Sequence, residues 1–256
     1  MRTELNNPVR YNLPVGSTLV PLNPLVGKNI RLSYKKEIYC IRCGRKTGKS
    51  FSQGFCYPCF VNSPENAECI IRPELCRAHL GEGRDIEWEK EHHLKEHFVY
   101  LAVSSGLKVG VTRATEIPTR WIDQGASKAL PLAKTPNRYL AGCIEVALKK
   151  FIADKTNWQR MLKNEMSGVD LIDEKLKSHA LFPDELKKYI IQQSEEITKI
   201  EYPVITYPSN VKSIGFDKTP DIEGVLMGIK GQYLIFDEGR VLNIRKHNGY
   251  VIGISY

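Results

Sequence analysis

The chain has 256 residues, 42% of them hydrophobic and 26% charged, proportions typical of a soluble globular protein. It holds no stretch of 18 apolar residues, and the N-terminal MRTELNNPVRYN lacks the apolar core of a secretory signal. We therefore expect a cytoplasmic protein that does not span a membrane. The net charge of +8 equals the excess in residues 1–60, which favours a polyanionic partner, although a solvated basic surface explains the charge equally well.

Strand patterns lie near both ends of the chain. Residues 15–39 alternate apolar and polar side chains around turn residues and predict two or three strands. Residues 201–256 return to this pattern, with the hairpin signal Asn248-Gly249. Neither segment closes a core alone, so we expect residues 1–39 and 201–256 to pair into one small β-barrel module.

The next segment, residues 40–97, is predicted to bind zinc. Its first two pairs of cysteines have the spacing C-x2-C and are separated by twelve residues. This spacing predicts a zinc-ribbon insert in which four thiolates hold a structural Zn2+, namely Cys40, Cys43, Cys56 and Cys59. Disulfides are the alternative, which a reducing compartment disfavours. Four thiolates leave no open coordination position, so this metal is not expected to be catalytic.

Basic side chains accompany the first cysteines. Arg42, Arg45 and Lys46 are candidate substrate-binding residues, because a basic ribbon suits nucleic acid, although zinc ribbons also serve only to stabilise a fold. A second, irregularly spaced cluster could close a second zinc site with Cys69, Cys76, His92 and His97. Its spacing leaves the choice of histidines open, and buried thiols with surface histidines remain the alternative.

Residues 98–165 predict two strands followed by helices. The stretch VYLAVSSGLKVGVTR reads as a hairpin, and Pro118 suits the first turn of a helix that carries Arg120. A second helix has an apolar stripe, with Glu145 at its edge beside two small residues. Residues 166–200 predict a helical extension that is amphipathic after Pro183.

The ordered residues of this core resemble the GIY-YIG nuclease fold over residues 98–164. The resemblance implies that Tyr100 is the first motif tyrosine and that Lys108-Val109-Gly110 is the second motif. It also implies that Arg120 is the motif arginine and Glu145 the metal-binding glutamate. Two departures are visible: Lys108 replaces the second tyrosine, and the interval from Arg120 to Glu145 is shorter than in better-known members.

A wider resemblance extends over most of the chain. The blocks QGFCYPCF, PELC, GLKVGVTR, PTRWIDQGA, DKTNW and GIKGQYLIF are similar to those of an uncharacterised bacterial family, domain of unknown function 2797. This family implies no established activity. The expected fold is therefore α+β: a zinc-ribbon insert, a GIY-YIG-like core of a small antiparallel sheet with helices, and the β-barrel module.

The resemblance to GIY-YIG nucleases implies metal-dependent hydrolysis of a phosphodiester in RNA or DNA. Glu145 would hold Mg2+ or Mn2+, Arg120 would grip the phosphate, and Tyr100 would act as the base if its pKa were lowered. Further candidate substrate-binding residues follow the hairpin: Thr112, Arg113, Trp121, Asp123 and Gln124. A nucleic-acid-binding adaptor without catalysis and an enzyme that modifies a base without strand scission are the alternatives. The sequence leaves the oligomeric state open.

Overall fold

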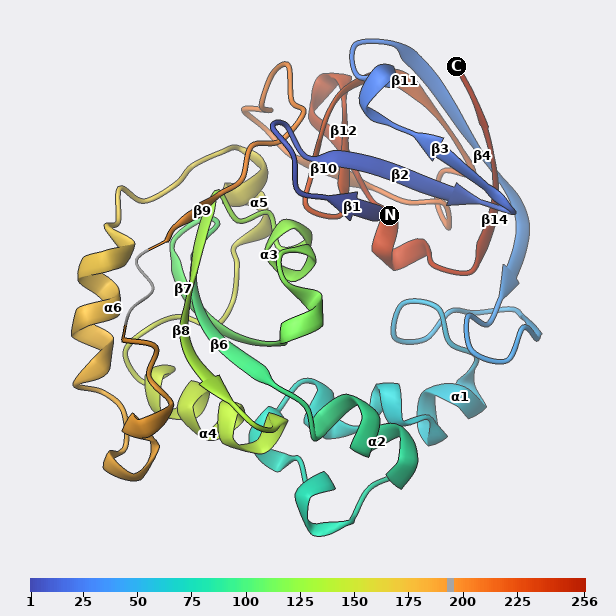
Figure 1. The fold of residues 1–256 in the computed structure, drawn as a ribbon. Coiled ribbons are helices and arrows are strands. Elements are labelled where there is room, and N and C mark those ends of the chain that lie inside the picture. The colour runs from blue at the N-terminus through green and yellow to red at the C-terminus, as the bar shows by residue number, and fades with distance from the viewer. Residues whose placement is uncertain (193–195) are drawn as a thin grey trace.

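The computed structural model describes residues 1–192 and 196–256 of an α+β protein (Figure 1). A strand-rich lobe contains both ends of the chain, and a smaller sheet with helices lies beside it. The cysteine-rich segment, drawn in cyan, runs from the first lobe toward the second. Among the residues that the structure describes, no helix has both the length and the apolar character needed to cross a membrane.

The larger sheet joins strands from both ends of the chain, as predicted. Its order is β10-β13-β12-β11-β4-β14, and β5 pairs separately with β4. The strands are β4 (Asn29–Tyr39), β5 (Lys46–Thr47), β10 (Lys212–Ile214), β11 (Asp221–Lys230), β12 (Tyr233–Phe236), β13 (Arg240–Asn243) and β14 (Tyr250–Ser255). β4 lies antiparallel between β11 and β14.

The predicted β-barrel is not a single closed barrel in the structure. The larger sheet curls like half a barrel, and a separate three-stranded sheet packs beside it, made of β1 (Arg2–Glu4), β2 (Arg10–Val15) and β3 (Thr18–Pro21). Tyr11, Leu32, Leu226 and Phe236 belong to the core of this lobe. The two sheets thus share one core without forming a single continuous barrel.

The smaller sheet has the order β7-β6-β8-β9. Its strands are β6 (His97–Val103), β7 (Leu107–Arg113), β8 (Lys128–Thr135) and β9 (Thr198–Lys199). The hairpin β6–β7 was predicted, whereas β8 was not, because Pro131 lies in its middle and proline cannot donate to a strand ladder. The structure accommodates Pro131 opposite Tyr100, where the register between β6 and β8 shifts.

Helices cover the smaller sheet and connect it to the rest of the chain. They are α1 (Tyr57–Asn62), α2 (Ile86–His93), α3 (Thr119–Asp123), α4 (Arg138–Leu148), α5 (Trp158–Leu162) and α6 (Leu171–His179). Short 3-10 turns span Asn23–Leu25, Pro64–Asn66, Glu68–Ile70, Pro73–Leu75, Ala78–Leu80, Ala114–Glu116, Asp184–Tyr189, Asp237–Gly239 and Ile244–His247. Ala141, Ile144 and Leu148 of α4 pack against Val99 and Leu101 of β6 in one hydrophobic cluster.

The amphipathic helix predicted for residues 183–200 was wrong. The structure has only the 3-10 turn Asp184–Tyr189, after which the β-branched Ile190 forms a bridge with Ala133. The Ile191 N–H donates to the Leu132 carbonyl at 3.0 Å. These residues therefore extend the edge of the sheet. Residues 193–195 of the predicted helix lie outside the described part of the chain.

Candidate functional site

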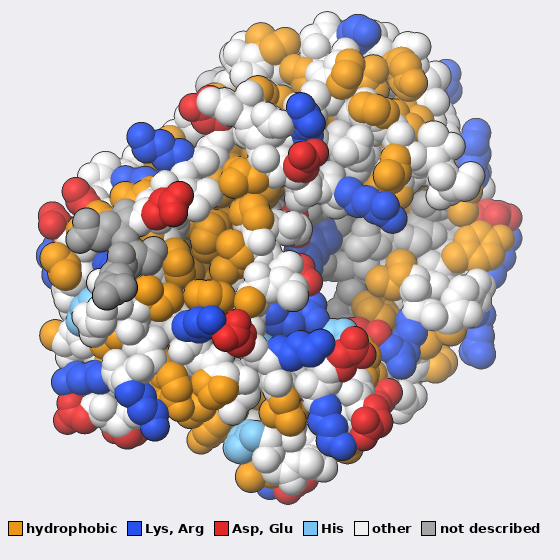
Figure 2. All heavy atoms as spheres, viewed as in Figure 1, with side chains coloured by type: hydrophobic (Ala, Val, Ile, Leu, Met, Phe, Trp, Pro, Cys, Tyr) orange, Lys and Arg blue, Asp and Glu red, His pale blue; other side chains and the backbone are white. Residues whose placement is uncertain are grey.

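One pocket of about 290 Å³ brings the four candidate catalytic residues together. Tyr100, Lys108, Arg120 and Glu145 all line it, and they come from β6, β7, α3 and α4. Thr112, Arg113 and Gln124, predicted to bind substrate, line the same pocket. Figure 2 shows that this face of the molecule is hollowed near its centre, with Lys and Arg side chains at the edge of the hollow.

The hairpin explains why Tyr100 needs a glycine opposite it. Tyr100 pairs with Gly110, and Ala102 pairs with Lys108. Because side chains two residues apart point to the same face of a strand, Tyr100 and Lys108 lie diagonally on one face. A Cβ at position 110 would lie 2.6 Å from the Tyr100 hydroxyl oxygen, so only glycine lets the phenol lie across β7.

The Tyr100 phenol is fully buried and hydrogen-bonded. Its hydroxyl oxygen accepts a hydrogen bond from Gln124 Nε2 at 2.5 Å, and its ring meets Trp121 edge-on with the centroids 6.0 Å apart. Burial raises the pKa of Tyr100, while Arg120 and Gln124 oppose this shift. A raised pKa keeps the phenol protonated near neutral pH, which disfavours the base role predicted for it and favours a hydrogen-bond donor.

Lys108 is the titratable group best suited to proton transfer in this pocket. Its side chain is 7% exposed, and burial lowers its pKa to about 8, with a further contribution from the positive charge of Arg120. Glu145 and Asp154 oppose the shift. A group whose pKa lies near the working pH is half in its basic form, the condition that favours general base catalysis.

Glu145 lies in the pocket with a second carboxylate nearby. Lys149 Nζ is 3.3 Å from Glu145 Oε2 and 3.3 Å from Asp154 Oδ2, so one ammonium bridges the two carboxylates. Burial raises the pKa of Glu145, and Lys149 opposes this shift. The Mg2+ ion expected at Glu145 stays a prediction.

The backbone around α4 is closely packed. A Cβ at Gly142, one turn before Glu145, would lie 2.2 Å from the backbone nitrogen of Glu74. The small residues beside Glu145 therefore admit the 3-10 turn Pro73–Leu75 rather than a ligand. This turn holds α4 in place behind the pocket.

Cations outnumber carboxylates around the pocket. The lining includes Lys108, Arg113, Arg120, Arg138 and Arg245, against Glu116, Glu145 and Asp154. Arg138 is fixed, since its Nε donates to the Cys69 carbonyl at 2.9 Å and its Nη2 to the Ile70 carbonyl at 2.8 Å. Such a concentration of guanidinium groups suits a phosphate or another multivalent anion.

Some predicted substrate-binding residues lie elsewhere. Trp121, a candidate for substrate binding, belongs to the hydrophobic core, where it is 3% exposed. Asp123 accepts a hydrogen bond from Gln232 Nε2 at 2.5 Å and also lies 3.7 Å from Arg245. Asp123 thus interacts with the side chains of Gln232 and Arg245.

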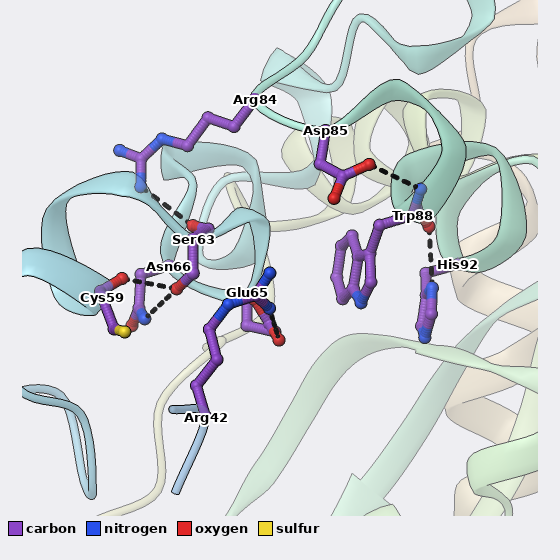
Figure 3. Close-up of polar contacts among 9 residues, drawn as sticks. All are labelled: Arg42, Cys59, Ser63, Glu65, Asn66, Arg84, Asp85, Trp88 and His92. Carbon is purple, nitrogen blue, oxygen red and sulfur yellow. Dashed lines mark hydrogen bonds and ion pairs between the residues drawn. The ribbon is translucent and has the colours of Figure 1, made fainter. Parts of the chain in front are cut away.

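The basic residues of the cysteine-rich segment also lie outside the pocket lining. Arg42 pairs with Glu65, Lys46 Nζ lies 2.7 Å from Glu37, and Arg45 is exposed. Figure 3 shows Arg42 extended toward Glu65, on the far side of a gap from Trp88. That these side chains bind nucleic acid stays a prediction, and it does not depend on the pocket.

The first four cysteines form a cluster that can bind a zinc ion. The sulfurs of Cys40, Cys43, Cys56 and Cys59 all lie within 4.8 Å of one another, and the thiols are free. Gly44, which follows the first pair, has a φ of 68°, a left-handed conformation that glycine adopts readily. The second pair differs from the predicted ribbon, because Cys56 caps α1 and Cys59 lies inside it.

The second cluster contains a histidine other than the two that were predicted as zinc ligands. The structure groups Cys69 and Cys76 with His93 instead. Successive residues of a helix point about 100° apart, so His93 reaches the two cysteines while His92 stacks on Trp88. His97 Nδ1 lies 2.8 Å from the Lys95 carbonyl oxygen, in β6.

Trp88 in the pocket wall was missed, and His92 beside it had been expected to bind zinc instead. Trp88 and His92, one turn apart on α2, stack with centroids 4.0 Å apart and an interplanar angle of 10° (Figure 3). His92 Nδ1 is 2.7 Å from the Trp88 carbonyl oxygen, and the Asp85 carboxylate accepts a hydrogen bond from the backbone N–H of Trp88. Their i, i+4 spacing was the available signal. Nothing in the sequence placed Asp154, Arg138 or Arg245 beside them.

Comparison with curated proteins and with solved structures gave no match in either case. A family model does match. It is described as a protein of unknown function, DUF2797, and it covers residues 27–252, which include the pocket, both cysteine clusters and most of both main sheets. The chain therefore belongs to the DUF2797 family.

Proposed function

We propose that this protein is a nucleic-acid-processing enzyme that hydrolyses a phosphodiester in the pocket around Lys108. The observation that carries the proposal is the convergence of Tyr100, Lys108, Arg120 and Glu145 in one basic pocket. Their placement on a first strand, a second strand, the following helix and a later helix supports the resemblance to GIY-YIG nucleases.

The pocket residues divide the work of hydrolysis between them. Arg120 and Arg138 bind nonbridging phosphate oxygens, and the Tyr100 phenol donates a hydrogen bond to the same group. The neutral amine of Lys108 takes a proton from water as the water oxygen attacks phosphorus. The bond from phosphorus to the leaving sugar oxygen breaks, and that oxygen takes up a proton from solvent. A Mg2+ ion held by Glu145 and Asp154 would supply additional positive charge at the phosphate.

The aromatic wall indicates how the substrate is oriented. Trp88 is half-buried and stacked on His92, so its ring is held in a fixed plane beside the cationic groups. Aromatic side chains bind unpaired bases by stacking, whereas arginines bind the backbone. This combination favours a single-stranded or splayed-out nucleotide over an isolated inorganic phosphate.

The test is cleavage of a panel of RNA and DNA substrates with Mg2+ or Mn2+. Glu145→Gln is expected to lower the rate at least 100-fold, because it removes the charged metal ligand and keeps the side-chain shape. Glu185→Gln is the matched control, since Glu185 is exposed on the 3-10 turn Asp184–Tyr189. Equal rates for wild type and Glu145→Gln would refute the nuclease proposal.

Base modification without strand scission is a second candidate, favoured by the lowered pKa of Lys108. A neutral buried amine beside an aromatic wall suits proton transfer on a bound base. This candidate predicts an RNA of changed mass and unchanged length in cells that carry the gene. Deletion of the gene should remove the mass change and leave the length as it is.

A binding adaptor without catalysis would bind nucleic acid with steep salt dependence and leave it unchanged. Its contact surface would be the cysteine-rich segment, so Arg42→Ala combined with Lys46→Ala should weaken binding and flatten the salt slope. Unchanged affinity in this double variant would exclude that segment as the principal contact surface.

A further inference from the structure

A second cluster of metal-ligating side chains lies behind the pocket. The ligand atoms of Cys69, Cys76 and His93 all lie within 4.8 Å of one another, and all three residues are buried. Cys76 Sγ is 3.5 Å from His93 Nδ1. The cysteines belong to short turns of the segment 68–76, whereas His93 is the last residue of α2.

A buried carboxylate lies beside the cluster, next to His93. Glu89 lies one turn before His93 on α2, is 2% exposed, and has its Oε2 3.7 Å from His93 Nδ1. Its other oxygen accepts the backbone N–H of Arg84 at 2.9 Å. Gly83 closes over it, since a Cβ at Gly83 would lie 2.3 Å from both carboxylate oxygens. Burial of a carboxylate beside two thiols is unfavourable unless a cation compensates it.

We propose that Cys69, Cys76, His93 and Glu89 bind a second zinc ion, independent of the four-cysteine cluster. Two sulfurs, one nitrogen and one oxygen are a ligand set that Zn2+ accepts in tetrahedral geometry. Thiolate ligands disfavour Mg2+ and Ca2+, which prefer oxygen. Four protein ligands leave no open position, so the role of this ion is structural.

The second zinc ion would fix the wall of the pocket. It joins the segment 68–76 to α2, which carries Trp88 and His92. The same segment packs its turn Pro73–Leu75 against Gly142 of α4 and accepts the Arg138 guanidinium at Cys69 and Ile70. Metal binding thereby positions Arg138 and the helix of Glu145 without contact between the ion and the substrate.

Zinc content per chain tests the proposal on the full-length protein. Wild type should contain two zinc ions, and Cys76→Ser and Cys56→Ser should each contain one. Cys143→Ser and His92→Ala are matched controls that should retain two. One zinc in wild type, retained by Cys76→Ser and lost by Cys56→Ser, would overturn the proposal. The measurement does not depend on catalysis, so its outcome is separable from that of the nuclease test.

Two further measurements test the proposal if the Cys76→Ser variant does not fold. Glu89→Gln keeps the shape of the side chain and removes its charge, and should lose one of the two zinc ions to a competing chelator at least tenfold faster than wild type. Cobalt substitution should give thiolate-to-metal absorption that falls by about one third when the Cys69–Cys76 site is lost, because two of six thiolates belong to it. Identical chelator kinetics for wild type and Glu89→Gln would exclude Glu89 as a ligand.

Discussion

Replacement of Lys108 by methionine should stabilise the protein while abolishing its activity. Burial lowers the pKa of Lys108 from 10.5 to about 8. A lysine with a lowered folded-state pKa destabilises the fold wherever it is protonated, and the penalty fades as pH rises from 8 toward the unfolded value. One pKa unit corresponds to about 1.4 kcal/mol, so the penalty is about 3 kcal/mol at pH 7 and about 1 kcal/mol at pH 10.

The assay is urea unfolding of wild type and Lys108→Met at both pH values. The variant should be more stable by up to about 3 kcal/mol at pH 7, and this advantage should shrink to about 1 kcal/mol at pH 10. A methionine of similar length fills the space of the lysine stem without a charge. A variant no more stable than wild type at pH 7, or an advantage independent of pH, would refute the reasoning.

Lys230 provides a matched control outside the pocket. Burial in the half-barrel lobe also lowers its pKa to about 8, and its Nζ donates to Asn164 Oδ1 at 2.8 Å. Lys230→Met removes a similar charge penalty and loses this hydrogen bond, which is worth about 1 kcal/mol. The control should therefore be stabilised less than Lys108→Met and should retain cleavage activity, which separates charge burial from catalysis.

Three other predictions concern the pocket. The cleavage rate should rise about tenfold per pH unit below pH 8 and level off above it, because Lys108 must be neutral to act as base; a rate that falls over this range in a pH–rate profile would assign Lys108 a cationic role instead. Gly110→Ala should destabilise the fold by about 2 kcal/mol through its clash with Tyr100, and an unchanged melting temperature would contradict the packing described for the hairpin. Trp88→Ala should weaken binding of single-stranded RNA by about tenfold in a fluorescence titration, whereas Phe151→Ala, which removes an exposed ring elsewhere, should not; equal affinities would exclude the stacking role.

Local signals in the sequence predicted the parts of the site that short segments determine. The spacing of Cys40, Cys43, Cys56 and Cys59 predicted their cluster, and apolar alternation predicted the hairpin that carries Tyr100. The order of the motif residues indicated which side chains meet, and the pocket contains all four. Their catalytic roles stay predictions.

Features that depend on tertiary partners could not be read from the sequence. Pro131 concealed β8, because the register shift that accommodates it exists only when β6 is in place. The choice of His93 over His92 depends on the rotation of α2 relative to a segment twenty residues earlier, which no spacing specifies. Ile190 and Ile191 fit the apolar pattern of a helix as well as that of a strand. The backbone groups of Leu132 and Ala133 at the edge of the sheet bind them, which favours the extended conformation.

The position of β4 between β11 and β14 has a consequence for synthesis of the chain on the ribosome. Residues 29–39 emerge early and can pair at once with the short β5, yet β11 and β14, the long partners on either side of β4, emerge only after residue 220. Arg245 of the pocket wall follows in the same late segment. The nascent chain thus exposes most of the edges of β4 for most of translation. A basic pocket that includes Arg245 exists only in chains whose synthesis has passed residue 245. Because of this strand order, the complete pocket forms only when the chain is almost fully synthesised, so truncated chains lack it.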